Sequence, residues 1–176
     1  MSIQTNKLLK KHLTQINKYK KDEKLNFDFD IKSCIAFNNS TQVWKLSCGN
    51  VVKVGIDYND DLIKIINYLR YNQNSSTVNI FSAGYGNKFY YYVMEEMFPL
   101  SLQERDLFDK LGYREFIAKR QPLTYDKRKF KKEVKFINNI YKNKFYQRDP
   151  HYGNIMKDKV GNYKFVDLES FDEFRR

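Results

Sequence analysis

Polar side chains near the C-terminal end of the chain have types and spacing suited to binding a hard metal ion and accepting a proton. In the segment "QRDPHYGN", Asp149 and Asn154 are five residues apart, and Pro150 and Gly153 between them favour a tight turn. Asp167 follows Asn154 by thirteen residues, at the end of the apolar stretch "YKFV". A hairpin between Asn154 and Asp167 is expected to return this second carboxylate to a position beside the amide.

The amide and the second carboxylate have the oxygen ligands that Mg²⁺ prefers, and two protein ligands suffice where nucleotide phosphates supply others. The remaining carboxylate, Asp149, can then accept a proton. The pattern therefore predicts Mg²⁺ bound by Asn154 and Asp167, with Asp149 as a general base. His151, in the same loop, is expected to pack the loop through a hydrogen bond to the backbone and not to bind a metal.

The elements that must position this loop begin with a β-rich front half. Alternating and apolar runs separated by polar turns predict strands at residues 25–31, 34–37, 42–47, 51–56, 78–86 and 88–97. The three strands between residues 34 and 56 are joined by tight turns, which predicts an antiparallel meander. Helices are predicted at 6–21, where the sequence is basic and amphipathic, and at 58–73, where the apolar spacing is helical.

The back half of the chain has helical patterns and then a hairpin. Residues 100–120 predict one or two helices interrupted near Gly112, and residues 125–144 predict a helix with one apolar stripe. That stripe consists of Phe130, Val134, Ile137 and Tyr141. Residues 154–171 predict a hairpin that turns at Gly161 and Asn162. The order of elements predicts an α+β fold.

The loop "QRDPHYGN" resembles the catalytic loop H-R-D-x-x-x-x-N of the protein-kinase-like superfamily, and "VDLE" resembles its D-F-G segment. The form D-x-H-x-G-N is more similar to the aminoglycoside, choline and lipopolysaccharide-core kinases. Lys53 in "VVKV" matches the strand lysine of V-A-I-K, and "VMEEM" is similar to the segment that joins the two lobes. The polar turn "NNSTQVW" occupies the place of the loop that covers the phosphates.

The resemblance implies a bilobal fold with an N-lobe at residues 1–96 and a short helical C-lobe at 97–176 that lacks the distal region. It implies ATP and Mg²⁺ as cofactors and gives each matching residue a role. Asp149 is the catalytic base, and Asn154 and Asp167 are the metal ligands. The nucleotide-binding residues are Lys53, Asn39, Ser40, Thr41, Glu95 and Met97, with the last two contributing backbone groups that bind adenine.

The sequence also departs from the pattern of that superfamily. Residues 38–41 are Asn, Asn, Ser and Thr where the glycines are expected, and Gln147 replaces the first histidine of the catalytic loop. Residues 57–94 contain no glutamate to pair with Lys53, although Asp60 or Asp61 can be considered as a substitute. Nine residues follow Asp167, too few for an activation segment or distal helices.

Composition limits the other classes of function. The formal charge of +11 favours an anionic partner without choosing among nucleic acid, phosphate esters, acidic proteins and lipid. Cys34 and Cys48 lack metal-site spacing, no secretory signal begins the sequence, and no apolar run is long enough to span a membrane. A cytoplasmic location is therefore expected. No hydrolase, zinc or nucleic-acid-binding motif is present.

The favoured hypothesis is a compact ATP- and Mg²⁺-dependent phosphotransferase, similar to a Ser/Thr protein kinase and acting on an acidic protein substrate or partner. A kinase for a small-molecule or sugar hydroxyl is one alternative. The missing glycines and the missing helix glutamate favour another, a pseudokinase-like binding module without turnover. The last alternative is a basic nucleic-acid-binding protein, although no specific nucleic acid is predicted as a partner.

Overall fold

The computed structural model describes residues 31–37, 40–56, 60–86, 89–112, 130–142, 146–147 and 151–172. Its largest feature is a five-stranded antiparallel sheet in the order β1-β2-β3-β5-β4. The strands are β1 (Ile31–Phe37), β2 (Thr41–Leu46), β3 (Val51–Ile56), β4 (Ile80–Tyr85) and β5 (Phe89–Met94). The predicted meander and the two later strands are confirmed. The predicted helix at 6–21 lies outside the described residues. Residues 25–30 of the first predicted strand also lie outside them.

Both faces of this sheet are covered by apolar packing. On β2 the side chains alternate, so that Trp44 and Leu46 are buried and join Val52, Val54 and Phe89 in a cluster on one face. The opposite face packs against α2 (Asp60–Tyr71). This helix buries the predicted stripe, which consists of Leu62, Ile65, Ile66 and Leu69. Its first turn carries two aspartates, which stabilise the positive end of the helix dipole.

A three-stranded sheet in the order β6-β8-β9 follows the large sheet. Its strands are β6 (Phe98–Pro99), β8 (Ile155–Lys157) and β9 (Tyr163–Phe165), and the last two form the predicted hairpin. The hairpin turns at Gly161, whose φ of 82° is a left-handed conformation that glycine adopts without strain. The Asp158 carboxylate accepts hydrogen bonds from the backbone N–H groups of Val160 and Asn162, which stabilises this turn.

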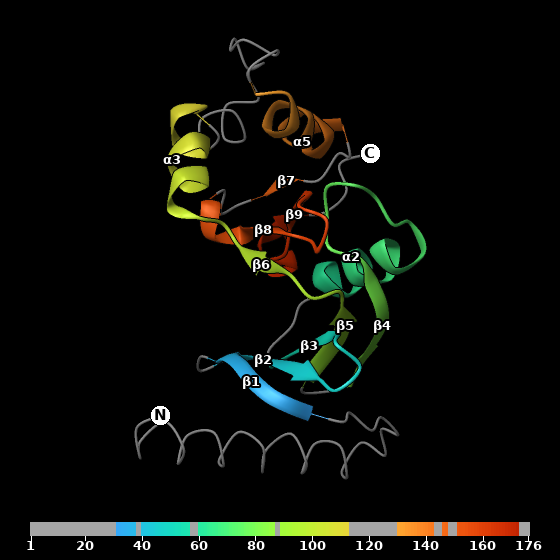
Figure 1. Cartoon of the computed structure of the whole chain (residues 1–176). Helices are drawn as coiled ribbons and strands as arrows, with labels where there is room; N and C mark the ends of the chain where they lie inside the picture. The colour runs from blue at the N-terminus through green and yellow to red at the C-terminus, as the bar shows by residue number, and fades with distance from the viewer. Residues whose placement is uncertain are drawn as a thin grey trace.

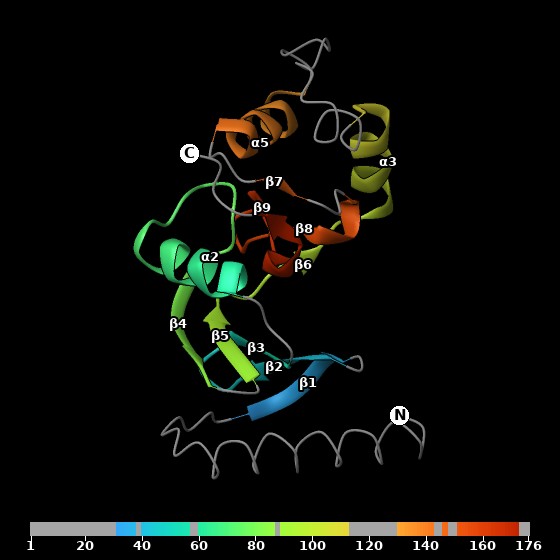
Figure 2. The same ribbon diagram turned by 180° about the vertical axis from the view of Figure 1, so that it is seen from behind.

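Two helices lie above this hairpin in Figure 1, and the view from behind in Figure 2 shows α2 between them and the large sheet. Helix α3 (Leu102–Lys110) begins with a capping box between Ser101 and Glu104 and ends before Gly112, as predicted. Helix α5 (Lys131–Lys142) is the described part of the predicted helix. It buries Val134 and Ile137 of the predicted stripe, and also Phe136, which the sequence did not place there.

Short elements complete the fold around the loop of interest. A one-turn helix, η1 (Tyr152–Asn154), precedes β8, and a second, η2 (Leu168–Ser170), follows β9. The strands β7 (Tyr146–Gln147) and β10 (Phe171–Asp172) pair with each other. No helix among the described residues is both long and apolar enough to cross a membrane.

One continuous core joins the large sheet to the hairpin. Tyr90 and Tyr92 of β5 belong to the same buried cluster as Phe165 and Leu168. The connection between α2 and β4 also pairs with β9, because Val78 N–H donates to Phe165 O at 2.9 Å and Phe165 N–H donates to Ser76 O at 2.8 Å. This junction holds β9, and the residues that follow it, against the middle of the sheet. The predicted division at residues 96 and 97 remains a prediction.

Candidate functional site

An ion-pair cluster forms where the end of the β8–β9 hairpin meets the large sheet. Lys53 lies in the middle of β3, opposite Val43 on β2 and Tyr92 on β5. Its ammonium donates to Asp167 Oδ1 at 3.1 Å and to Glu169 Oε2 at 2.6 Å. The side chains of Lys53, Asp167 and Glu169 are 12%, 29% and 24% exposed, so the cluster is largely but not completely shielded from solvent.

The second oxygen of Glu169 is also used. Tyr90 OH donates to Glu169 Oε1 at 2.6 Å, so the carboxylate bridges a lysine on β3 and a tyrosine on β5. The Tyr90 ring stacks on Tyr92, with centroids 6.3 Å apart. These contacts give Glu169 one defined orientation, which in turn gives the Lys53 ammonium a defined position.

The electrostatics of the cluster follow from its burial and from its excess of negative charge. Burial on its own lowers the pKa of Lys53, but Glu169 and Asp167 more than offset this and raise it above its usual value. Burial raises the pKa of Glu169, and neighbouring Asp167 raises it further, against the opposing effect of Lys53. Burial, followed by the charge of Glu169, also raises the pKa of Tyr90, which keeps its hydroxyl protonated as a donor.

The two predicted metal ligands lie at the same end of the hairpin. Asn154 ends η1 and is 8% exposed, and Asp167 follows β9 by two residues. Val166 N–H donates to Asn154 O at 3.0 Å, which extends the hairpin pairing to the residue before Asp167. In the described part of the chain no three His, Cys, Asp or Glu side chains gather as a metal site. The predicted arrangement of one amide and one carboxylate does not require such a group.

The predicted base, Asp149, lies outside the described residues, and the residues that follow it show how the loop turns. His151 Nδ1 accepts a hydrogen bond from Gly153 N–H at 3.0 Å and caps η1, which confirms the predicted packing role of this histidine. A Cβ atom at position 153 would lie 2.5 Å from Cε1 of His151. A side chain at position 153 would therefore displace the imidazole from the position in which it accepts this hydrogen bond.

The predicted phosphate-covering loop is described in part. Asn39 lies outside the described residues, whereas Ser40 is exposed and its carbonyl accepts from Ile56 N–H at 2.9 Å. Thr41 begins β2 opposite Gly55 of β3. Ser40 and Thr41 therefore lie beside the end of β3, close in register to Lys53.

The side chain of Glu95 binds within the protein. Its Oε1 accepts from Asn79 N–H at 2.8 Å and from Lys164 Nζ at 2.5 Å, and its own N–H donates to Asn79 O at 3.2 Å. Met97 is half-buried and packs against the main core. The predicted contact with adenine thus depends on the Glu95 carbonyl and on the backbone of Met97, because the Glu95 N–H is engaged.

Sequence reasoning missed Glu169 as the partner of Lys53. The search for a substitute considered Asp60 and Asp61 at the start of α2, but Asp61 accepts from Lys64 on its own helix at 3.3 Å. The sequence "VDLES" does indicate such a partner, because two acidic residues flank Leu168, which is completely buried. A buried residue in a one-turn helix after a core strand places the acids on either side of it next to the sheet.

No protein-family model matches this chain, and no curated protein matches it.

Proposed function

We propose that this protein is a compact ATP- and Mg²⁺-dependent phosphotransferase with a protein-kinase-like, bilobal arrangement. The observation that carries the proposal is the contact of Lys53, in the middle of the sheet, with Asp167 at the end of the hairpin that also holds Asn154. The proposal assigns Lys53 as the cation for phosphate oxygens, and the side-chain oxygens of Asn154 and Asp167 as the ligands of the metal ion. Lys53 is 114 positions from Asp167 in the sequence.

The donor set fits Mg²⁺ because it consists of hard oxygen ligands, one from an amide and one from a carboxylate. When bound, Mg²⁺ supplies neutralisation of charge on the phosphate oxygens. Asn154 and Asp167 hold it, and Lys53 supplies a second positive charge beside them. Glu169 and Tyr90 orient Lys53, in the way that a helix glutamate does in the kinases that this sequence resembles.

Asp149 completes the mechanism as the base. It orients the acceptor hydroxyl and takes its proton while the hydroxyl oxygen forms a bond to the γ-phosphorus. The bond between the γ-phosphorus and the bridging oxygen of ADP breaks in the same step, and ADP carries away that electron pair. Neutralisation by Lys53 lowers the energy of this leaving group. The proposed acceptor is a hydroxyl of an acidic protein, because the chain is strongly basic.

A nucleotide-binding module without turnover is the second candidate. The observation that favours it is the polar turn at residues 38–41, which has no glycine to let backbone amides approach the phosphates. This candidate shares nucleotide binding with the first and lacks phosphate transfer.

The test is the melting temperature with and without MgATP. At about 100 times its dissociation constant, a ligand stabilises the fold by about 2.7 kcal/mol. For a chain of this size that is a rise of about 5 to 10 °C. The variant Lys53→Met should lose most of this rise, whereas Lys64→Met, which removes an exposed lysine from α2, should retain it. An unchanged melting curve for the wild type at saturating MgATP would refute both candidates.

A further inference from the structure

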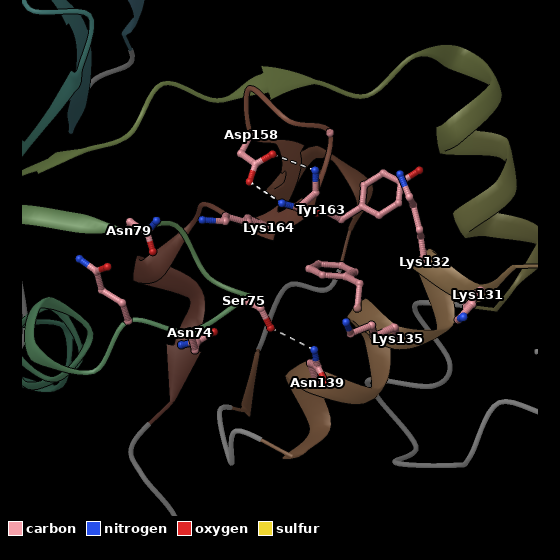
Figure 3. Close-up of a pocket in the computed structure, with 14 residues that line it drawn as sticks. Asn74, Ser75, Asn79, Lys131, Lys132, Lys135, Asn139, Asp158, Tyr163 and Lys164 are labelled. Atoms are coloured by element: carbon pink, nitrogen blue, oxygen red, sulfur yellow. Dashed lines mark hydrogen bonds between the residues drawn. The ribbon is translucent and has the colours of Figure 1, made fainter.

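A cavity whose described lining includes none of Lys53, Asp167 and Glu169 lies beside the β8–β9 hairpin. It has a volume of about 670 Å³ and is lined by the α2–β4 connection, by α5 and by the β8–β9 turn. Figure 3 shows side chains from all three segments around it, with Lys132 and Lys135 on α5 and with Asp158 and Lys164 on the hairpin. A cavity of this size accommodates a small organic ligand.

The described lining of the cavity has an excess of positive charge. Among the described residues, no carboxylate pairs with Lys131, Lys132 or Lys135, which lie together on the first turns of α5. Six other described lysines do have carboxylate partners: Lys45, Lys53, Lys64, Lys157, Lys159 and Lys164. Lys131 and Lys135 are also four positions apart on one helix, where like charges destabilise each other. A bound anion would relieve this repulsion.

Asp158, the one carboxylate among the described lining residues, does not compensate for these lysines. Asp158 accepts hydrogen bonds from Val160 N–H and from both the N–H and the side-chain amide of Asn162. Burial raises its pKa, but these hydrogen bonds more than offset the effect and lower it. The carboxylate therefore remains ionised and occupied with the turn, and the lining as a whole stays positive.

The walls of the cavity are held in place before any ligand binds. Asn139 Nδ2 on α5 donates to Ser75 Oγ at 3.1 Å, which links two of the three segments (Figure 3). Asn74 Oδ1 accepts from the N–H groups of Ser76 and Thr77, which shapes the α2–β4 connection. The floor is apolar, because Phe136 lines the cavity and contacts Tyr163 with ring centroids 6.0 Å apart. Such a site combines an apolar floor with a cationic rim.

We propose that this cavity binds a small phosphate ester, with the phosphate at Lys131, Lys132 and Lys135 and the organic part over Phe136. A phosphate group carries enough negative charge to pair with several ammonium groups, and each charge-assisted hydrogen bond is stronger than a neutral one. The volume of about 670 Å³ is suited to one small molecule. The site is separate from the proposed MgATP site and does not depend on it.

The test is calorimetric titration with ribose 5-phosphate in the absence of Mg²⁺. Wild-type protein should show saturable binding, and the double variant Lys132→Gln/Lys135→Gln should bind at least about tenfold more weakly, since each lost charged hydrogen bond contributes a factor of this order. Both lysines are exposed, so the substitutions leave the core intact. The matched control, Lys64→Gln/Lys110→Gln, removes two exposed lysines elsewhere and should bind like the wild type.

The variant Lys53→Met separates this proposal from the proposed function. It should keep its affinity for ribose 5-phosphate even though it loses the response to MgATP. Absence of saturable binding in the wild type, or equal affinity in the double variant and its control, overturns the proposal. Binding of single-stranded oligonucleotides through the same lysines, tighter than binding of ribose 5-phosphate, also overturns it in favour of a nucleic-acid surface.

Discussion

Replacing Glu169 by glutamine in a protein that already lacks the Lys53 charge should restore stability. In the wild type, the Lys53 ammonium lies 2.6 Å from Glu169 Oε2 and 3.1 Å from Asp167 Oδ1. The variant Lys53→Met leaves these two partly buried carboxylates together without a cation. Removing one partner from a buried ion pair destabilises a protein by about 3 to 5 kcal/mol.

The expected size of the rescue follows from the geometry of the cluster. Glutamine at position 169 removes one of the two uncompensated charges and keeps an oxygen that can accept from Tyr90 OH. Residues in one ion-pair network show interaction energies of about 0.5 to 3 kcal/mol. Because the Glu169 contact is the shorter of the two and its carboxylate is the less exposed, we expect a rescue of at least about 1 kcal/mol. Alone, Glu169→Gln should change stability by no more than about 1 kcal/mol, since burial already raises the pKa of Glu169 and disfavours its ionised form.

The assay is a double-mutant cycle measured by urea unfolding of the wild type, Lys53→Met, Glu169→Gln and the double variant. The control cycle uses Lys64→Met and Asp61→Asn, an exposed pair on α2 whose coupling should be below about 0.5 kcal/mol. The rescue should grow as pH rises above the usual pKa of a glutamate, because burial raises the pKa of Glu169 and the cost of ionising it therefore appears as pH rises through that raised pKa. If the double variant is less stable than Lys53→Met, or if the two changes are additive within about 0.5 kcal/mol, the assigned ion-pair network is wrong.

Three further predictions concern the loop and the start of α3. Asp149→Ala should retain the melting shift with MgATP but lower the rate of γ-phosphate transfer by about two to four orders of magnitude. Asp167→Asn should impair both the melting shift and the transfer rate. Equal transfer of labelled γ-phosphate by the wild type and Asp149→Ala would exclude the role of Asp149 as the base. Gly153→Ala should destabilise the protein by about 1 to 3 kcal/mol, since its Cβ would lie 2.5 Å from the His151 ring. Adding His151→Ala to this variant should recover part of the lost stability, as measured by urea unfolding. Burial alone would raise the pKa of Glu104, but hydrogen bonds from Lys157 and Ser101 lower this pKa from 4.5 to about 2. The contribution of Glu104 to the stability of the fold is therefore present above pH 4.5 and is lost as pH falls towards 2. Acid titration should show this loss, at most about 3 kcal/mol and less for a partly exposed group, and Glu104→Gln should remove it; an identical acid profile for that variant would contradict the assignment.

Local patterns in the sequence were sufficient for most of the described elements. The stripe of α2 and the alternation of β2 are properties of successive residues, since periods of 3.6 and 2 residues put apolar side chains on one face. The hairpin turn at Gly161 was also predicted from local sequence, because glycine tolerates a left-handed conformation. The expected proximity of Asn154 and Asp167 followed from this hairpin alone, without any contact between distant parts of the chain.

Only the tertiary structure decided which charged groups meet. Lys53 and Glu169 are 116 positions apart, and neither position has a periodic signal that refers to the other. They come together because the backbone pairing of Ser76 and Val78 with Phe165 docks β9 on the sheet, and buried Leu168 then turns Glu169 towards β3. Glu95 shows the same dependence, since its side chain binds Lys164 only after the hairpin has docked. Secondary structure depends on neighbours along the chain, whereas an ion pair between distant elements depends on how their buried faces pack, and this packing is a property of the whole core.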